Sequence, residues 1–298
     1  MKIRKSFSRV IYSFLSVNNR SFISRKKPST LQFGMILSVL LMVLAHQTAA
    51  QDLDVPYVPT PNDVVEQMLE LAHVGPGDYV IDLGSGDGRI VIAAVKRGAV
   101  GHGVDLDPER IEEAMANAEE EGVTDRVMFQ QGDIFETDFS NASVITLYLL
   151  SSVNEKLRPL LFENLSPGTR VVSHSFSMGD WQPDNEIRYA NRSLYFWLIP
   201  AEAEGSWEWQ VNGESFTIDT EQTFQEVDVT ARNGNRELTT EEAVLKGKRL
   251  NLILNDEETN TRYIYSGVIE GDSINGTVQV HAEDSQSIEE WSAMRNGQ

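Results

Sequence analysis

The chain of 298 residues contains no cysteine, which excludes disulfide bonds and metal sites built on thiolates. We predict no metal site. Basic side chains are also scarce, because 25 Lys and Arg stand against 45 Asp and Glu, for a formal charge of −20. Such a surface repels nucleic acid, so we expect no nucleic-acid partner. Solubility explains the acidic excess, with recognition of a basic substrate as the alternative.

Residues 1–50 differ in composition from the rest of the chain. They hold eight Lys or Arg and no acid, and they include an apolar run over residues 35–45 and small residues at 48–50. This order is typical of an export signal cleaved before Gln51, and the apolar run is shorter than the ~20 residues of a membrane span. We expect an exported protein, periplasmic or envelope-associated. An uncleaved anchor, which would keep the chain near a membrane, and a cytoplasmic protein are the alternatives.

A glycine-rich turn at residues 82–88, Asp-Leu-Gly-Ser-Gly-Asp-Gly, is the most informative motif. It follows an apolar run, residues 79–81, and precedes a predicted helix that begins near Arg89. Glycine permits φ > 0 and leaves the backbone bare, and a helix start offers unpaired N–H groups, so the turn is predicted to bind a ligand. A dinucleotide fingerprint runs Gly-x-Gly-x-x-Gly. Here the third glycine comes one residue early and Asp87 stands where phosphate would lie, which favours a cationic or zwitterionic nucleoside.

Two further acids follow predicted strands. Asp105 comes after residues 100–104, and Asp133 comes after residues 127–130. An Asp after a strand is often a helix cap or turn former, but the carboxyl ends of parallel strands meet at one edge of a sheet, beside the glycine turn. There Asp105 can accept two hydrogen bonds from a ribose diol, and Asp133 can accept one from an adenine amino group. The three strand ends together predict one binding site.

Four segments carry a resemblance to a known family. They read VPTP, DLGSGDGRIVIAA, GVDLDP and SMGDWQP, at residues 58–61, 82–94, 103–108 and 177–183. In these segments the chain resembles the class I S-adenosylmethionine-dependent methyltransferases, and most closely the prokaryotic and mitochondrial lysine methyltransferases related to the ATP synthase c-subunit enzyme. The resemblance covers about residues 55–185. It implies S-adenosyl-L-methionine as the cofactor, methyl transfer as the reaction, and a protein with an accessible lysine as the acceptor.

The resemblance also implies a role for each part of the predicted site. The glycine loop would hold the methionine part of the cofactor, Asp105 would hold the ribose, and Asp133 would lie near the adenine. The full predicted cofactor site comprises Asp82, Gly84, Ser85, Gly86, Gly88, Asp105, Asp133 and Thr60.

Catalytic residues are harder to identify. Methyl transfer is an in-line displacement that depends mainly on positioning, so we predict no general base. Tyr148 and His174, near the ends of predicted strands, are the candidates to border the substrate, with core packing as the alternative for both. Residues 146–149 read Thr-Leu-Tyr-Leu and not the Pro-Pro-Tyr motif found in many enzymes that methylate amino groups of bases or glutamine. That substrate class is disfavoured.

Alternating strands and helices predict an α/β fold, a doubly wound, parallel, Rossmann-like sheet. Thr60 is predicted to cap a helix that has Pro61 at its first position, and Asp107 another that has Pro108 there. Further strands are predicted at residues 143–150, 169–176 and 194–199, and a further helix at residues 153–165. The predicted domains are a signal or anchor at residues 1–50, a methyltransferase domain at 51–200 and a β-rich domain at 201–298.

The C-terminal part is predicted to be a small all-β, barrel-like domain, loosely similar to lipocalin-type barrels. Three Asn-Gly pairs, Asn212-Gly213, Asn233-Gly234 and Asn275-Gly276, predict hairpin turns, since this pair tolerates φ > 0 at both turn positions. We expect its large apolar residues to form the core, with a pocket lining as the alternative. They are Trp207, Trp209, Leu252, Ile253, Leu254, Tyr263, Tyr265, Val268, Val278 and Trp291.

A second function stays open at the level of sequence. S-adenosylmethionine is made in the cytosol, and nothing in the chain indicates how it would reach an exported enzyme. The alternative is therefore an exported, non-catalytic binding protein that retains a nucleoside-type pocket in a methyltransferase fold.

Overall fold

A computed structural model describes residues 57–297. The predicted export segment, residues 1–50, lies outside this part of the chain, so its role stays a prediction. Within residues 57–297 the helices are too short or too polar for a membrane span.

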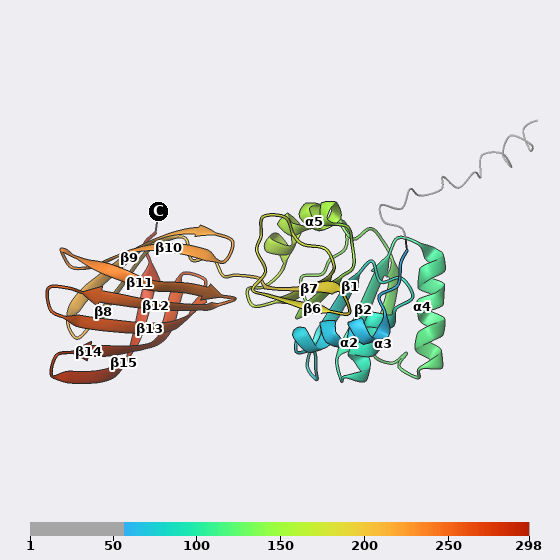
Figure 1. Ribbon diagram of the computed structural model, residues 1–298, viewed down its shortest axis with the longest axis horizontal. Coiled ribbons are helices and arrows are strands. Elements are labelled where there is room, and N and C mark those ends of the chain that lie inside the picture. Colours follow the sequence, from blue (N-terminus) through green and yellow to red (C-terminus); the bar gives the residue numbers. More distant parts are fainter. Residues whose placement is uncertain (1–56, 298) are drawn as a thin grey trace, which may run out of the picture. The chain divides into compact units, whose positions relative to one another are not determined.

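The first part of the described chain is built on a seven-stranded sheet in the order β3-β2-β1-β4-β5-β7-β6 (Figure 1). Its first five strands in the chain are parallel, as predicted. The strand order switches between β1 and β4, and sheets of this kind bind ligands at such a switch point. The strands are β1 (Tyr79–Leu83), β2 (Val100–Asp105), β3 (Val127–Gln131), β4 (Val144–Leu147), β5 (Arg170–His174), β6 (Asn185–Tyr189) and β7 (Arg192–Leu198).

Helices cover both faces of this sheet, because successive strand residues point to opposite sides. Val80 and Val144 pack with α2 and α3, whereas Ile81 and Ile145, one residue further on, pack with α5. Figure 1 shows α5 across the sheet from α2 and α3. Each fully buried Val, Leu or Ile contributes ~1.5–3 kcal/mol. The helices are α2 (Asn62–Leu71), α3 (Arg89–Lys96), α4 (Pro108–Glu120) and α5 (Ser151–Asn164).

The sheet differs from the prediction at one edge, where it is not parallel. β7 runs antiparallel to β5, with Val172 opposite Phe196, and β6 pairs antiparallel to β7. The prediction missed β6 because its alternating residues are mostly solvent-exposed at an edge. Its hairpin turn also lacks glycine, since Ala190 and Asn191 adopt the positive φ angles of 49° and 61°.

The second part of the chain is a closed, eight-stranded antiparallel barrel. Its interior is filled by aromatic side chains, among them Trp207, Trp209 and Trp291, which are at most 4% exposed. The expectation of a core is confirmed except for Ile253 and Val268, which are only half-buried. The strands are β8 (Gly205–Val211), β9 (Glu214–Thr223), β10 (Glu226–Asn233), β11 (Arg236–Lys246), β12 (Arg249–Asp256), β13 (Thr261–Glu270), β14 (Ser273–Ala282) and β15 (Ser285–Arg295).

Two of the three Asn-Gly turn predictions are confirmed, and the third is wrong. Asn212-Gly213 and Gly234 lie in the β8–β9 and β10–β11 turns. Asn275-Gly276 lies inside β14, where a Cβ on Gly276 would stand 2.0 Å from the Ser266 carbonyl oxygen. Here glycine serves a close approach of two strands and not a reversal of the chain.

Candidate functional site

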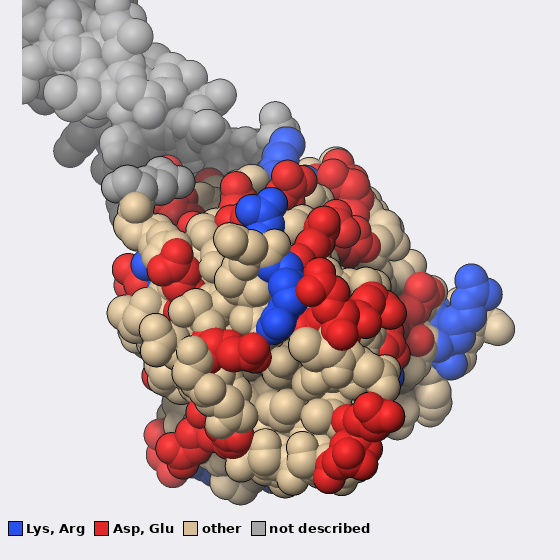
Figure 2. Space-filling model, turned by 90° about the vertical axis from the view of Figure 1, so that its left-hand side faces the viewer, with Lys and Arg blue, Asp and Glu red and all other residues tan. Residues whose placement is uncertain are grey.

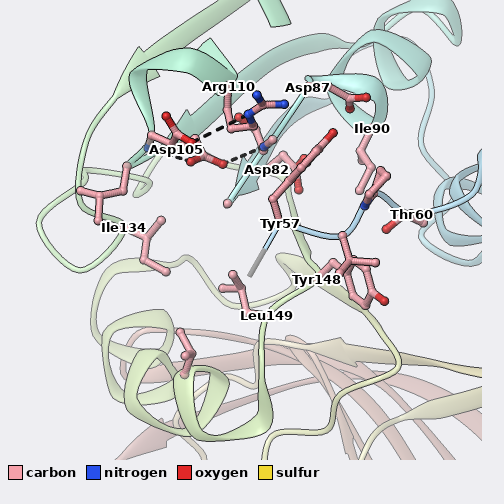
Figure 3. Close-up of a pocket in the computed structure, with 18 of the residues that line it drawn as sticks. Tyr57, Thr60, Asp82, Asp87, Ile90, Asp105, Arg110, Ile134, Tyr148 and Leu149 are labelled. Carbon is pink, nitrogen blue, oxygen red and sulfur yellow. Dashed lines mark hydrogen bonds and ion pairs between the residues drawn. The ribbon is translucent and has the colours of Figure 1, made fainter. Parts of the chain in front are cut away.

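A cavity of about 310 Å³ opens at the carboxyl ends of the parallel strands (Figure 3). Its walls come from the turns after β1, β2, β3 and β4, from the segment after β5, and from residues 57–60. Seven of the eight predicted cofactor residues line it, together with Tyr148: Thr60, Asp82, Gly84, Ser85, Gly86, Asp105 and Asp133. Gly88, the eighth predicted cofactor residue, and His174 do not line it.

The glycine turn after β1 adopts the backbone that its sequence predicts. Gly84, Gly86 and Gly88 have φ angles of 84°, 51° and 77°, which side chains rarely tolerate. The N–H groups of Gly84 and Ser85 both donate to the Val104 carbonyl oxygen, at 2.8 and 2.9 Å, and so tie the turn to β2. Gly88 is the N-cap of α3. The turn therefore presents bare backbone to the cavity in a fixed conformation.

Asp82 lies at the floor of the cavity and is 2% exposed. Thr146 Oγ1, on the neighbouring strand, donates a hydrogen bond to Asp82 Oδ1 at 2.6 Å, while Oδ2 is buried without a partner. Burial, with a contribution from the negative charges of Asp105 and Asp87, raises the pKa of Asp82 to about 7. The Thr146 hydrogen bond lowers this pKa but does not outweigh burial. A buried acceptor without a partner costs free energy, which a donor group brought by a ligand would offset.

Asp105, at the end of β2, is held by two backbone groups. Its Oδ2 accepts from the Gly86 N–H at 2.8 Å, and its Oδ1 accepts from the Asp107 N–H at 2.9 Å. Each carboxylate oxygen keeps a second lone pair, so the group can still accept two hydrogen bonds from a diol. The first of these contacts also joins the glycine turn to the second strand end.

Asp133, after β3, lies at the exposed rim of the cavity. Its Oδ1 accepts from the Phe135 N–H at 2.9 Å, which is the turn-forming role that an Asp after a strand often takes. Ile134 and Phe135 line the cavity beside it with apolar surface. A contact of Asp133 with an adenine amino group stays a prediction.

Asp87 does not present a free negative charge, contrary to the expectation from sequence. Arg89 Nε and Nη2 donate to its two carboxylate oxygens, at 2.9 and 2.5 Å. Burial favours the protonated form, but the bonds from Arg89 outweigh it and hold the pKa of Asp87 below its usual value. The negative charges that disfavour phosphate are therefore those of Asp105 and of ionised Asp82, because the charge of Asp87 is compensated.

Thr60 does not cap α2, so that prediction is wrong. Pro61 itself occupies the N-cap position, with φ −57° and ψ 143°, and the helix begins at Asn62. The Thr60 hydroxyl instead bonds His174 Nδ1 at 3.0 Å. Burial, with the positive charge of Arg192, lowers the pKa of His174 to about 4, so the imidazole is neutral at pH 7.

Tyr148 leaves the sheet one residue after β4, which ends at Leu147 and not at residue 150 as predicted. Its ring borders the cavity and stacks on His174, with ring centroids 3.9 Å apart. Tyr148 thus faces the site, whereas His174 is fully buried behind it.

The residues of the site that were missed from sequence include Tyr57, Arg110, Thr146 and Phe176. The Tyr57 ring lies against Gly86, and the Arg110 guanidinium lies 4.7 Å over that ring. The lone hydroxyl of Thr146 in an apolar strand was a usable signal, because that strand had to pair with the one holding Asp82. Tyr57 and Arg110 carried no such signal.

Comparison with known proteins finds methyltransferases that act on different acceptors. Residues 82–185 match the model of the ANTKMT methyltransferase domain family. A protein-lysine N-methyltransferase from Saccharolobus islandicus is 49% identical over 153 residues, which cover 49% of this chain and 94% of that protein. The lysine N-methyltransferase of the ATP synthase c-subunit from Xenopus laevis is 31% identical, covering 58% of this chain and 78% of that protein.

A solved structure, an RNA methyltransferase from Salinibacter ruber in complex with S-adenosyl-L-homocysteine, is 57% identical to the chain. The match covers 49% of this chain and 95% of the solved chain, with a TM-score of 0.48.

Proposed function

Since the chain belongs to the S-adenosylmethionine-dependent methyltransferases related to the ATP synthase c-subunit lysine methyltransferases, we propose that it methylates the side-chain amine of a lysine in a protein. The acceptor is taken from the relatives that are lysine methyltransferases, at 49% and 31% identity. The alternative of a non-catalytic binding protein gains no support, because these relatives are enzymes.

S-adenosylmethionine is the cofactor of this family, and the cavity has the groups to hold it. The observation that carries this fit is the buried Asp82 Oδ2, which lacks a partner and is available to the ammonium group of the methionine part. Asp105 is available to the ribose hydroxyls, and the apolar side chains of Ile134 and Phe135 to the adenine ring.

The bound cofactor supplies an activated methyl group on a sulfonium. The residues of this chain would position the acceptor amine in line with that group, which is where most of the rate acceleration of such a displacement arises. A lysine must also lose a proton before it can attack. An apolar wall lowers the pKa of an amine, and Leu149, Leu150 and Val153 supply one in this cavity.

A protein acceptor also agrees with the charge of the chain. Residues 51–298 carry 17 basic and 45 acidic side chains, once the eight basic residues of the N-terminal segment are set aside. Figure 2 shows one face on which Asp and Glu are far more numerous than Lys and Arg. Such a surface attracts lysine-bearing segments and repels nucleic acid, so we propose that RNA and DNA are not acceptors.

Export of the chain is a separate proposal, supported by the basic and apolar composition of residues 1–50. Mass spectrometry of the chain purified from its own cell tests it. A mature N-terminus at Gln51 supports a cleaved signal, and an intact chain in the membrane fraction supports an anchor near the membrane. An intact chain in the cytosol contradicts both and removes the difficulty of cofactor supply.

The proposed reaction is tested with the purified chain and S-adenosylmethionine that carries a radioactive methyl group. The acceptors are lysine-containing peptides, the same peptides with arginine in place of lysine, and total RNA. We expect label in the lysine peptides alone, and tandem mass spectrometry should place the added methyl group on the lysine side chain. Label in RNA, or equal label in the arginine peptides, would contradict the proposal.

Cofactor binding is tested separately by calorimetric titration with S-adenosylhomocysteine. We expect micromolar binding that Asp105→Ala abolishes, because this carboxylate, held by the Gly86 N–H through Oδ2 and by the Asp107 N–H through Oδ1, is the group available to the ribose hydroxyls. Gly75→Ala is the matched control, since a Cβ there meets nothing within 4 Å.

A further inference from the structure

Two aromatic side chains, Tyr148 and Phe176, line the cavity on the side of β4 and β5. Their ring centroids lie 5.9 Å apart, and the ring planes meet at 31°. In the strand order β3-β2-β1-β4-β5, they lie across the glycine turn from the acids that follow β2 and β3. Figure 3 shows Tyr148 and Asp105 on opposite sides of the cavity. With the adenosyl part on the β2 and β3 side, as proposed above, this side is left for the acceptor.

The backbone that carries Phe176 into the cavity is strained. Ser175 has a φ of 65°, and the Phe176 N–H donates to the His174 carbonyl oxygen at 2.9 Å, which closes a three-residue turn. Three-residue turns with positive φ at the centre are rare, and such strain persists only where the surroundings enforce it.

Surrounding side chains do enforce this turn. Ser173 Oγ donates to the Phe176 carbonyl oxygen at 2.7 Å, and Asn154 Nδ2 donates to the same oxygen at 3.2 Å. Asn154 and Ser173 are both fully buried. The fold thus uses a strained residue and two buried polar side chains to place one ring.

Tyr148 is supported in a similar way. His174 stacks beneath its ring and is itself fixed by the Thr60 hydroxyl. His174 and Thr60 are at most 3% exposed, whereas Tyr148 and Phe176 stay half-buried. Rings that only filled the core would be covered like His174, so the two exposed ring surfaces are available to a ligand.

We propose that Tyr148 and Phe176 form an aromatic wall that first receives the acceptor side chain as an ammonium group; the amine attacks only after this group has lost its proton to solvent. This proposal deepens the proposed function and rests on it. Aromatic faces attract alkylammonium groups, methylated ones included, and the neighbouring Leu149, Leu150 and Val153 suit the methylene chain that leads to such a group.

The first test measures binding without catalysis. The probe is butyltrimethylammonium, added to the full chain loaded with S-adenosylhomocysteine and followed by saturation-transfer NMR. We expect the wild type to bind it and Phe176→Leu and Tyr148→Leu to bind it about 3- to 30-fold more weakly, the range expected when one cation–π contact is lost. Phe176→Tyr, which restores a ring, should bind the probe more tightly than Phe176→Leu.

Two controls separate the wall from general damage to the fold. Each variant is titrated with S-adenosylhomocysteine, whose affinity should change by less than about threefold because the rings lie on the acceptor side. Tyr189→Leu removes a half-buried ring from the end of β6, outside the cavity lining, and should leave probe binding unchanged.

The second test uses lysine peptides. We expect the KM for the peptide to rise in Phe176→Leu and Tyr148→Leu, by about the same factor as the loss of probe affinity. If the wild type does not bind the probe, or if the KM is unchanged in both variants, the proposal of an aromatic wall is wrong and the proposed function is unaffected. If the probe binds and the variants lose it while no lysine peptide is methylated, the wall stands and the proposed function fails.

Discussion

Thr146 and Asp82 form a buried hydrogen bond between neighbouring strands, 2.6 Å from Oγ1 to Oδ1, and the second Asp82 oxygen is buried without a hydrogen-bond partner. A carboxyl group in this state can be neutral or charged near neutral pH, since its pKa is raised to about 7. The affinity for a cationic cofactor should therefore depend on pH.

We expect the affinity for S-adenosylhomocysteine to increase as pH rises from 5.5 to 8 and to level off above about 7. Below its pKa Asp82 is protonated and attracts the ligand's ammonium group less, and one titrating group changes the affinity by at most tenfold per pH unit. Calorimetric titration at several pH values measures this. Asp82→Asn should bind weakly at every pH, and the matched Asp133→Asn should keep the slope. A slope that survives in Asp82→Asn would assign the effect to another group.

Gly86→Ala should weaken binding of S-adenosylhomocysteine more than tenfold. Gly86 has a φ of 51°, and a Cβ at this position would lie 2.5 Å from the Tyr57 ring. The substitution therefore strains the turn, at a cost of ~1–3 kcal/mol, and displaces a ring that lines the cavity. Thermal unfolding and calorimetric titration report the two effects.

The comparison variant for this prediction is Gly75→Ala, where φ is not positive and the space is open. Its free energy of unfolding should change by no more than ~0.5 kcal/mol. Equal effects of the two substitutions would mean that the glycine turn is not the sensitive feature.

Ser175→Gly should leave the free energy of unfolding unchanged or raise it by up to ~1 kcal/mol. The φ of 65° is unfavourable for serine and free of penalty for glycine, which offsets the greater entropy of glycine in the unfolded chain. Ser175→Val should lower it by ~1–3 kcal/mol, since a β-branched residue fits this conformation poorly. Urea denaturation measures both. A loss of stability in Ser175→Gly would show that the serine is not strained.

His174 should make the protein less stable in acid. Its pKa is about 4 in the folded protein and 6.5 when unfolded, so the unfolded chain binds more protons between these values. Stability from this residue is complete above pH 6.5 and falls as pH decreases to 4, by ~3 kcal/mol at most. Asp82 acts in the opposite direction, because its raised pKa makes the folded state gain protons as pH falls below 7.

The two contributions are separated by variants. His174→Gln should flatten the loss of stability between pH 6.5 and 4 in urea denaturation, whereas His73→Gln, at an exposed histidine, should leave it unchanged. If His174→Gln keeps the acid sensitivity of the wild type, the buried imidazole is not its cause.

Local patterns predicted the strand ends of the site well. Asp82, Asp105 and the glycines each follow a short apolar run, and parallel strands bring such ends together whatever the details of packing. The ion pair of Asp87 with Arg89, two residues further on, was not predicted. Charge compensation between near neighbours depends on side-chain direction, which a sequence pattern does not contain.

Long-range placements were beyond the sequence. Thr60 and His174 are 114 positions apart, and the hydrogen bond between them replaced the helix cap predicted for Thr60. Phe176 reaches the cavity because Ser175 adopts a positive φ. Serine has no preference for this conformation, so the sequence did not indicate it. Edge strand β6 escaped because its exposed residues have too weak an apolar alternation to be recognised, and β7 was predicted as a strand without its antiparallel direction.

The barrel is closed by the pairing of its last strand, β15, with its first, β8. Every barrel strand pairs with its successor in the chain, so only the junction of β15 with β8 joins distant segments, through Met294 opposite Glu208 and Arg295 opposite Trp207. A variant shortened by its last few amino acids would convert a sheet without free edges into an open one with two. Open edges recruit other chains, and such a shortened protein should aggregate during expression even though its active site is untouched.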